Sequence, residues 1–443
     1  MNIVISPIKK DWNQLLERPT KSIDDIESLV LHVFSEVKEQ GDSALLRYTS
    51  VFDKVDIPSL QVSEKEIRKA CNLVSEELKN AIAVAKTNIE KFHNAQKSTK
   101  VAVETTKGVS CWQEKRPISE VGLYIPGGTA PLFSTVLMLA IPAKIAGCKE
   151  IVICTPPNAS GEIPPAILYA AQLCGVTKIF KVGGIQAVAG MTLGTQSIPK
   201  VSKIFGPGNQ YVTIAKQVAT KFGVAIDMPA GPSELMVFAD ATANAEFVAS
   251  DLLSQAEHGA DSQVILVTTS KNFISNVSIE IEKQLKELPR IGIAQEAMTN
   301  SKLIYVNSKE IAMELINVYA PEHLIICSEN EDYFLENIQN AGSVFIGNYT
   351  PESAGDYASG TNHTLPTNGF SKAYSGVNLD SFLKSITFQK ITREGIQRIG
   401  KSIEIMAEAE GLQAHKNAVS LRLEEIRKSN KISTPKSYEE KNI

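Results

Sequence analysis

The sequence predicts an α/β protein with two consecutive Rossmann-like parallel-sheet domains, a helical N-terminal region and a helical C-terminal arm. Three observations support this fold class. Short apolar runs alternate with helix-length segments through the middle of the chain, which is the pattern of βαβ units. Both ends instead carry apolar residues at helical spacing. The chain has 443 residues, too many for a single hydrophobic core.

The N-terminal region (residues 1–110) is predicted to be mainly helical, because its apolar residues recur at helical spacing between charged faces. The helices expected there are Ile23–Gln40, Ser63–Ala70 and Ser75–Gln96. At the other end, residues 381–443 form the predicted arm, with helices over Arg393–Glu410 and Leu412–Ser429 separated by Gly411. A polar, mobile tail is expected to follow.

Residues 111–233 and 234–380 are each predicted to form a parallel sheet with helices on both faces. The strands expected in the first domain are Val121–Ile125, Glu150–Thr155, Thr177–Val182, Ser202–Phe205 and Val224–Asp227. Those expected in the second are Glu234–Ala239, Ser262–Thr268, Lys302–Val306, His323–Cys327 and Ser343–Gly347. A ligand cleft is expected beside the break at Met228–Glu234, since open α/β sheets bind ligands beyond the carboxyl ends of their strands.

Composition argues against nucleic-acid and membrane functions. A net charge of -4 gives no basic field for a phosphate backbone. The most apolar run, Leu132–Ile145, is shorter than the roughly 20 residues of a membrane span, and the N-terminus lacks a signal-peptide core. The six cysteines form no CxxC pair, which suits a reducing compartment. We therefore expect a cytoplasmic enzyme or binding protein.

Two segments place candidate ligands or acid–base groups close together. Gln255 and His258 stand three residues apart at the end of a predicted helix, on one face; they either hold a ligand or simply end the helix before Gly259. Glu322 and His323 are adjacent, directly before the apolar run Leu324–Cys327 of a predicted strand. Their types suit proton transfer, because histidine titrates near neutrality and burial can raise the pKa of a glutamate.

The long polar segment 347–367 contains Glu352, Asp356 and His363 and is expected to be a functional loop with metal-type donors. Glu410 and His415 flank Gly411 in the arm and, by themselves, resemble a solvated helix start. YIPGG (124–128), VGGIQAVAG (182–190) and FGPGNQY (205–211) each lie between a predicted strand and a helix, where backbone amides can hold an anion. None is a GxGxxG motif, and no acidic residue follows at ribose-binding distance, so spacing alone does not predict a nucleotide.

Together these segments resemble the histidinol dehydrogenase family. The resemblance runs from Glu114 to Val419, in family order, and is carried by EKRPISEVGLYIPGG, KIFGPGN, AIDMPAGPSE, ASDLLSQAEHGADSQVIL, YAPEHL, GSVFIGNYTPESAGDYASGTNHTLPT and EGLQAHKNAV. It implies oxidation of L-histidinol to L-histidine, through a bound aldehyde, with two molecules of NAD. It also implies one zinc ion per subunit and an intertwined homodimer.

The same resemblance implies roles for individual residues, most of them in the second domain. The zinc ligands would be Gln255, His258, Asp356 and His415. Glu322 and His323 would be the acid–base pair, with His323 also near substrate. Ser233, His363 and Glu410 would lie near substrate, with Glu410 and His415 coming from the other subunit. Tyr124, Gln186 and Asn209 would contact NAD.

Two other interpretations remain open at this point. A metal-dependent hydrolase on the same scaffold would use Glu322 to activate a metal-bound water. A non-catalytic imidazole-binding or sensory protein would keep the pocket without turnover. Independence from NAD distinguishes the first, and full binding without reaction distinguishes the second.

Overall fold

The computed structural model describes residues 1–19, 23–127 and 131–432, and these divide into two compact units. The first unit is built from residues 1–97 and 117–382, and the second from residues 98–116 and 383–443. Gly128 of the YIPGG segment and the polar tail from residue 433 lie outside the described residues. No helix in the described part of the chain is long and apolar enough to span a membrane.

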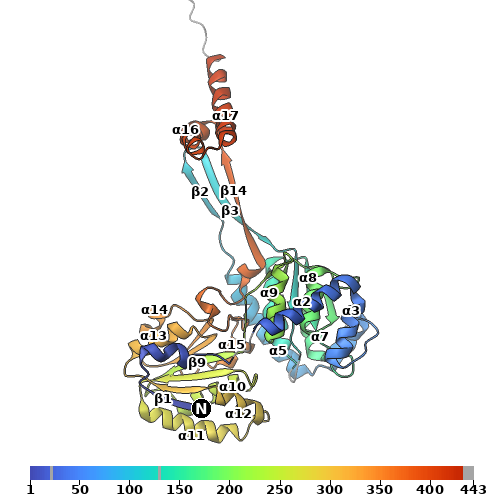
Figure 1. Cartoon of the computed structure of the whole chain (residues 1–443), viewed down its shortest axis with the longest axis vertical. Coiled ribbons are helices and arrows are strands. Elements are labelled where there is room, and N and C mark those ends of the chain that lie inside the picture. Colours follow the sequence, from blue (N-terminus) through green and yellow to red (C-terminus); the bar gives the residue numbers. More distant parts are fainter. Residues whose placement is uncertain (20–22, 128–130, 433–443) are drawn as a thin grey trace, which may run out of the picture. The chain divides into compact units, whose positions relative to one another are not determined.

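The first parallel sheet has the strand order β6-β5-β4-β7-β8. Figure 1 labels helices α2, α5, α7, α8 and α9, which surround it. Its strands are β4 (Glu120–Tyr124), β5 (Glu150–Thr155), β6 (Lys178–Lys181), β7 (Lys203–Phe205) and β8 (Ala225–Ile226), all parallel to their neighbours. All five follow the predicted segments. Alternate residues of β5 point to opposite faces, so Ile151 and Ile153 enter one hydrophobic core while Val152 and Cys154 enter the other.

Helices cover both faces of this sheet. One face packs against α2 (Ile23–Gln40), α8 (Gly184–Leu193) and α9 (Gln210–Thr220), and the other against α5 (Glu76–Ala95), α6 (Phe133–Ala146) and α7 (Pro165–Leu173). The remaining helices are α3 (Asp42–Tyr48), a π-helical turn η2 (Thr49–Asp53) and α4 (Glu64–Leu73). The predicted helix starts are confirmed by caps: Ser63 forms a capping box with Glu66, and the Ser75 hydroxyl accepts from the Leu78 amide.

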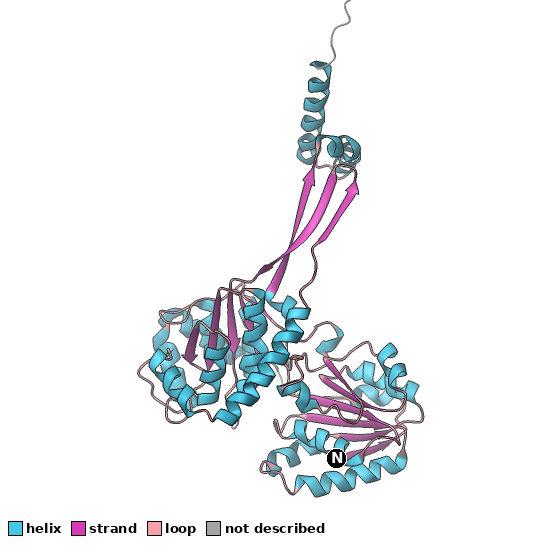
Figure 2. Ribbon diagram, turned by 180° about the vertical axis from the view of Figure 1, so that it is seen from behind, coloured by secondary structure: helices cyan, strands magenta, loops and turns pink. Residues whose placement is uncertain are grey.

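The second sheet repeats the topology of the first. Figure 2 shows both sheets, each flanked by helices. Its strands are β9 (Glu234–Ala239), β10 (Gln263–Thr268), β11 (Lys302–Tyr305), β12 (His323–Cys327) and β13 (Ser343–Ile346), in the order β11-β10-β9-β12-β13, with β1 (Asn2–Ile5) added beside β11. In both sheets, therefore, the third, second, first, fourth and fifth strands in sequence stand side by side. The two Rossmann-like sheets predicted from the sequence are confirmed.

Two groups of helices sandwich the second sheet. One face packs against α10 (Ala245–Ala256), α11 (Lys271–Leu285) and α12 (Ile291–Thr299), and the other against α1 (Trp12–Leu15), α13 (Lys309–Tyr319) and α14 (Glu331–Asn337). Three 3-10 turns, η1 (Lys9–Asp11), η3 (Phe370–Lys372) and η4 (Leu379–Phe382), and the short helix α15 (Glu352–Tyr357) complete the unit. Strand β9 is buried along its whole length, which explains its unbroken apolar run from Leu235 to Ala239.

The second unit joins two distant parts of the chain. A three-stranded sheet of order β14-β3-β2 combines β2 (Val101–Thr106), β3 (Val109–Pro117) and β14 (Leu383–Ile391), with β2 and β3 antiparallel. Helices α16 (Arg393–Ala409) and α17 (Gln413–Ile432) follow and pack against each other. The arm is helical as predicted, but it also contains strands.

Four strands lie where the sequence predicted none: β1, β2, β3 and β14. Strand β1 is a mostly exposed edge strand, and every residue of β2 but the last is exposed, so neither shows the buried apolar run used to predict the others. The division at residues 110, 233 and 380 stays a prediction. The structure adds that residues 98–110, predicted with the helical N-terminal region, belong to the unit that contains the arm.

Candidate functional site

A pocket of about 280 Å³ lies in the first unit, beside the break between the two sheets. It is lined by Met228 and by Ala230 to Ser233, as expected for a cleft beside this break. Pro126 and the 206–209 loop enter it from the carboxyl ends of β4 and β7. The second sheet contributes differently from the prediction, since Glu322 and His323 lie at the amino end of β12. The cleft therefore uses carboxyl ends of only one sheet.

Gln255 and His258 both line this pocket. Gln255 lies in the last turn of α10 and is buried, whereas His258 is exposed in the turn that follows. The amide of His258 donates to the carbonyl of Gln255 at 3.3 Å, which holds the turn against the helix end. The carboxyl end of a helix carries partial negative charge, so this position also favours a bound cation.

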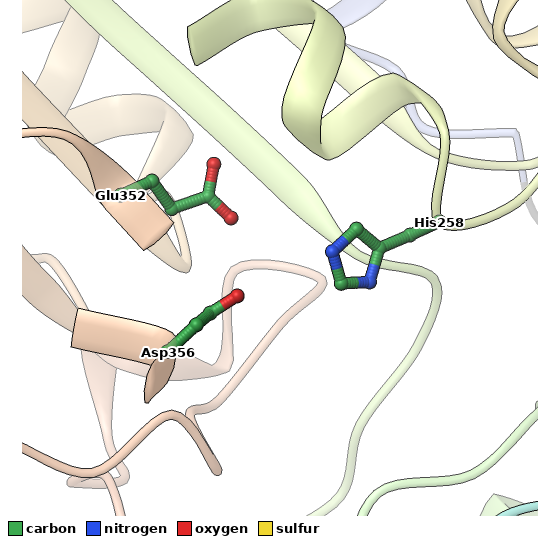
Figure 3. A group of neighbouring side chains, drawn as sticks. All are labelled: His258, Glu352 and Asp356. Atoms are coloured by element: carbon green, nitrogen blue, oxygen red, sulfur yellow. The ribbon is translucent and has the colours of Figure 1, made fainter. Parts of the chain in front are cut away.

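Glu352 and Asp356 face the same region from α15. They are four residues apart, so one face of this single-turn helix presents both carboxylates. With His258 they bring three possible ligand atoms within 4.8 Å of one another, and Figure 3 shows the three side chains pointing toward a common space. Opposite ligands of one ion with bonds of about 2.1 Å lie roughly 4 Å apart. The cluster thus has the size of a metal site.

The segment that carries α15 was predicted to be a loop without regular structure, and this is wrong. Pro351 caps a six-residue helix, which is too short for a periodic pattern to be recognised. Glu352 was seen as a possible donor in that loop but was not among the predicted ligands. Its helical spacing to Asp356 is the signal that would have placed it in the cluster.

The amide group of Gln255 lies between the Glu352 carboxylate and the backbone amide of Glu234 and can take two orientations. With its nitrogen turned toward Glu352, it donates a hydrogen bond to that carboxylate, and its oxygen accepts from the amide of Glu234 at 3.2 Å. With its oxygen turned toward Glu352, two acceptors face each other. That second orientation is favourable only when a cation lies between the oxygens. Gln255 can therefore serve as a hydrogen-bond donor or as an oxygen ligand.

Glu322 and His323 are both buried and are positioned by the backbone of Glu234. The Glu322 carboxylate accepts from the Glu234 amide at 3.0 Å, and His323 Nδ1 lies 3.4 Å from the Glu234 carbonyl oxygen. His323 Nδ1 is 3.6 Å from Glu322 Oε2. When Nδ1–H donates to the Glu234 carbonyl, the lone pair of the neutral ring lies on Nε2. Nε2 is buried, has no hydrogen-bond partner among the described residues, and lies 3.7 Å from Asp356 Oδ1.

Negative charge dominates the site. Burial alone disfavours an imidazolium at His323, but the carboxylates of Glu322 and Glu352 outweigh it and hold the His323 pKa well above its usual value. Burial raises the pKa of Glu352 to about 8, despite the opposing effect of His323. A divalent cation among these carboxylates would compensate their charge, so the electrostatics fit a metal site.

Ser233 and His363 also line the pocket. His363 Nδ1 lies 3.1 Å from the backbone oxygen of Asp356, and its Nε2 lies 3.2 Å from the Thr135 hydroxyl. Burial lowers the His363 pKa, with Asp356 opposing the shift. His363 therefore fixes the end of α15 on which Asp356 stands.

The predicted NAD contacts gather around the ends of the first sheet. The Tyr124 hydroxyl accepts from the Gly184 amide at 3.1 Å, and burial raises the Tyr124 pKa to about 12. Asn209 caps α9 by accepting from the Val212 amide at 3.1 Å. Gln186 is buried in α8, and its Oε1 has no partner within the described chain. The region therefore offers helix N-termini and an unpaired acceptor.

Glu410 and His415 do not belong to this unit. Glu410 ends α16 and His415 lies in the first turn of α17; both are exposed in the second unit.

Comparison with known proteins identifies the family. The model of the family described as histidinol dehydrogenase matches residues 16–423. The histidinol dehydrogenase of Bacteroides thetaiotaomicron is 58% identical over 427 residues, covering 96% of this chain and 100% of that protein. That of Escherichia coli (strain K12) is 52% identical over 428 residues, covering 94% and 98%. The chain belongs to the histidinol dehydrogenase family.

A solved structure agrees with this assignment. The crystal structure of histidinol dehydrogenase from Elizabethkingia anophelis aligns with a TM-score of 0.94 at 58% identity, covering 96% of this chain and 99% of that one. The resemblance predicted from the motifs is confirmed. As a member of the histidinol dehydrogenase family the chain is an oxidoreductase, so neither the hydrolase nor the non-catalytic interpretation is favoured.

Proposed function

We propose that this chain oxidises L-histidinol to L-histidine, through bound L-histidinaldehyde, as the last step of histidine biosynthesis, with two molecules of NAD. The observation that carries the proposal is the buried Glu322–His323 pair beside a cluster of metal-type donors, in a chain of the histidinol dehydrogenase family. An acid–base pair next to a cation site is what two oxidations with an intervening hydration require.

Zinc fits the donor set. Gln255, His258 and Asp356 would hold it from the first unit, with His415 supplied by a second copy of the chain. The buried Glu352 carboxylate lies among these donors and compensates the charge of a cation. When bound, zinc would also hold nitrogen atoms of the substrate and so orient it.

NAD fits the ends of the first sheet. Tyr124, Gln186 and Asn209 are the proposed contacts, and the unpaired Gln186 oxygen is an acceptor that a ligand donor would satisfy. When bound, NAD would accept the hydride released in each oxidation.

His323 is the proposed base of both oxidations. In the first oxidation, Nε2 takes the proton of the substrate hydroxyl. The hydride leaves the carbon that carries this hydroxyl, and the aldehyde forms. Nε2 is suited to this because Nδ1 faces the Glu234 carbonyl oxygen, which leaves the Nε2 lone pair free once a bound cation compensates the carboxylates that raise the His323 pKa. In the second oxidation, the same nitrogen takes a hydroxyl proton of the aldehyde hydrate, and the acid forms.

Glu322 is the proposed base for the hydration between the oxidations. Its carboxylate would take a proton from water as the oxygen of that water adds to the aldehyde carbon. The Glu234 amide holds one carboxylate oxygen at 3.0 Å, which fixes the group and leaves the other oxygen for the water. Ser233 and Glu410 are proposed to contact the substrate, while His363 positions Asp356.

We further propose an intertwined homodimer in which Glu410 and His415 complete the site of the other copy. The second unit supports this, because α16 and α17 expose large apolar side chains. The exposed fraction is 54% for Ile405, 64% for Met406 and 65% for Leu421. Large apolar side chains at such exposure are available to pack against another protein surface.

The test is an assay of the purified protein with zinc, histidinol and NAD. We expect NADH to form, and we expect a chelator to abolish its formation and added zinc to restore it. Formation of no NADH by a zinc-loaded protein would contradict the proposal. Turnover of an amide or ester without any nicotinamide would support a hydrolase in its place.

A further inference from the structure

A second cavity lies at the carboxyl ends of the first sheet. It measures about 410 Å³ and is bordered by the loops after β4 and β5 and by Gly184 at the start of α8. Pro126 and Asn209 line both this cavity and the catalytic pocket, so the two adjoin. A sheet with this strand order binds a dinucleotide across the carboxyl ends of its strands. The cavity is therefore placed to take the part of a dinucleotide that lies away from the reacting carbon.

The acid that usually holds the adenosine ribose is absent from its usual place. In dinucleotide-binding folds it follows the second strand. Here that strand is β5, and Thr155 is followed by Pro156, Pro157 and Asn158. The next acid, Glu162, is exposed and pairs with Lys69 at 3.1 Å. A ribose in the cavity would need a carboxylate from elsewhere.

Asp53 supplies that carboxylate from the N-terminal helices. It is the last residue of the π-helical turn η2, and Lys54 follows with a left-handed φ of 56°. Such turns are rare and often occur at functional sites. Among the described residues that line the cavity, Asp53 alone carries a carboxylate, and none is a lysine or arginine.

The Asp53 carboxylate lacks a protein partner. Its Oδ2 is buried and has no hydrogen-bond partner within the described chain. Burial raises the pKa of this carboxyl to about 6. An unpaired buried acceptor of this kind is what a site leaves ready for ligand donors.

We propose that Asp53 accepts hydrogen bonds from the adenosine ribose hydroxyls of the dinucleotide and makes the chain select NAD over NADP. The inference rests on the proposed function, since it assumes a nicotinamide dinucleotide. A 2′-phosphate would meet the carboxylate in place of a hydroxyl donor, and the cavity offers no lysine or arginine among its described residues to compensate it.

The experiment titrates the zinc-loaded protein with NADH and NADPH in the absence of histidinol. Asp53→Asn keeps the side-chain shape, and Asp56→Asn is the matched control, since Asp56 is an exposed acid of the same segment. We expect Asp53→Asn to weaken NADH binding about tenfold and to narrow the NADH-over-NADPH preference by a similar factor. Asp56→Asn should change neither.

A second measurement needs no variant. The wild-type protein should bind NADH carrying a 2′-deoxyadenosine about tenfold more weakly than NADH, whereas Asp53→Asn should hardly distinguish them. Two results would overturn the inference about Asp53: equal binding of NADH and its 2′-deoxyadenosine analogue by the wild-type protein, or an unchanged NADH-over-NADPH preference in Asp53→Asn. If NADH is still formed from histidinol, the proposed function stands in either case. A wild-type protein that neither binds NADH nor reduces NAD overturns the proposed function as well.

Discussion

At the scale of single residues, the two nitrogens of His323 have different surroundings. Nδ1 faces the Glu234 carbonyl and the Glu322 carboxylate, while Nε2 lies 3.7 Å from Asp356 Oδ1 and has no hydrogen-bond partner among the described residues. Glu322 is fixed by the amide of the same Glu234. One backbone position thus orients both members of the proposed acid–base pair, which allows a different base for each step.

Because Glu322 and His323 are proposed to act in different steps, Glu322→Gln should affect the two oxidations unequally. The variant should slow conversion of the aldehyde to the acid by about 10²-fold or more, because general base catalysis of hydration is lost. Oxidation of the alcohol should change much less. Single-turnover NADH formation, started from histidinol or from histidinaldehyde, measures each step. Equal losses in both steps would rule out this role, and Glu329→Gln, an exposed position after the same strand, is the control.

The pKa of Asp53 predicts a pH-dependent gain in stability for Asp53→Asn. Its folded pKa of about 6 lies above the usual 3.8, so the ionised carboxylate destabilises the fold fully above pH 6 and not below about pH 4. The whole shift corresponds to about 3 kcal/mol. Since the side chain is partly exposed, screening reduces the expected gain in unfolding free energy to about 1 kcal/mol near pH 7.5.

Thermal unfolding without dinucleotide, at several pH values, measures this difference. The gain should shrink as the pH falls from 6 toward 4. A gain that is constant with pH, or that grows at low pH, would show that burial of the Asp53 charge is not its cause.

At the scale of elements, the site depends on how the start of β9 is held. Arg18, which follows α1, reaches Glu234 at 2.5 Å and the Tyr319 backbone oxygen at 2.8 Å, with its guanidinium 3.9 Å from the Tyr319 ring centre. Tyr319 is the last residue of α13, three residues before Glu322. Arg18 of the N-terminal segment therefore contacts both β9 and the end of α13, the two elements next to the proposed acid–base pair.

Removing the Arg18–Glu234 ion pair should destabilise the protein strongly. Arg18→Met leaves the buried Glu234 carboxylate unpaired, and breaking a buried pair in this way costs about 3–5 kcal/mol. Lys9→Met, which breaks an exposed pair with Glu314, should cost less than about 1 kcal/mol. The double change Arg18→Met with Glu234→Gln should recover much of the loss. Urea unfolding decides, and similar losses for Arg18→Met and Lys9→Met would disprove the argument.

The strands and helices that could be predicted from sequence are those whose buried residues form a regular apolar pattern. β5, β9, β12 and α2 have the predicted bounds, because each buries a continuous or periodic apolar face. β1 and α15 could not be predicted, since one is an exposed edge and the other a single turn. Pairing of β2 and β3 with β14 joins segments more than 260 residues apart, for which local patterns carry no information.

The candidate site divides in the same way. The sequence predicted two pairs of site residues, because reactive residue types stand close together in it: Gln255 with His258, and Glu322 with His323. Glu352 was visible only as a loop carboxylate, and Asp53 was not visible at all. Its approach to a cavity at the ends of β4 and β5 is a product of packing between the N-terminal helices and the first sheet.

At the scale of the whole molecule, two sheets of the same strand order contribute opposite ends to one pocket. The first brings helix N-termini and loops that suit a dinucleotide, and the second brings the proposed acid–base pair and the metal-type donors. The exposed Glu410 and His415 stand in the other unit. The proposed dimer would give these two residues their function.

Mixed dimers test that arrangement. His258→Ala and His415→Ala should each be inactive alone, because each removes a proposed zinc ligand. After subunit exchange, some hybrid dimers would carry both changes in one site and none in the other, so a fraction of the wild-type activity, up to about a quarter, should return. No recovery despite demonstrated exchange would place His415 in the site of its own chain or outside any site.

The central claim is that one site performs both oxidations. The most direct measurement is the ratio of NADH formed to histidine formed, with free aldehyde assayed in the same reaction. The account predicts two NADH for each histidine and no accumulating aldehyde. One NADH for each histidinol consumed, with free histidinaldehyde and no histidine, would contradict it.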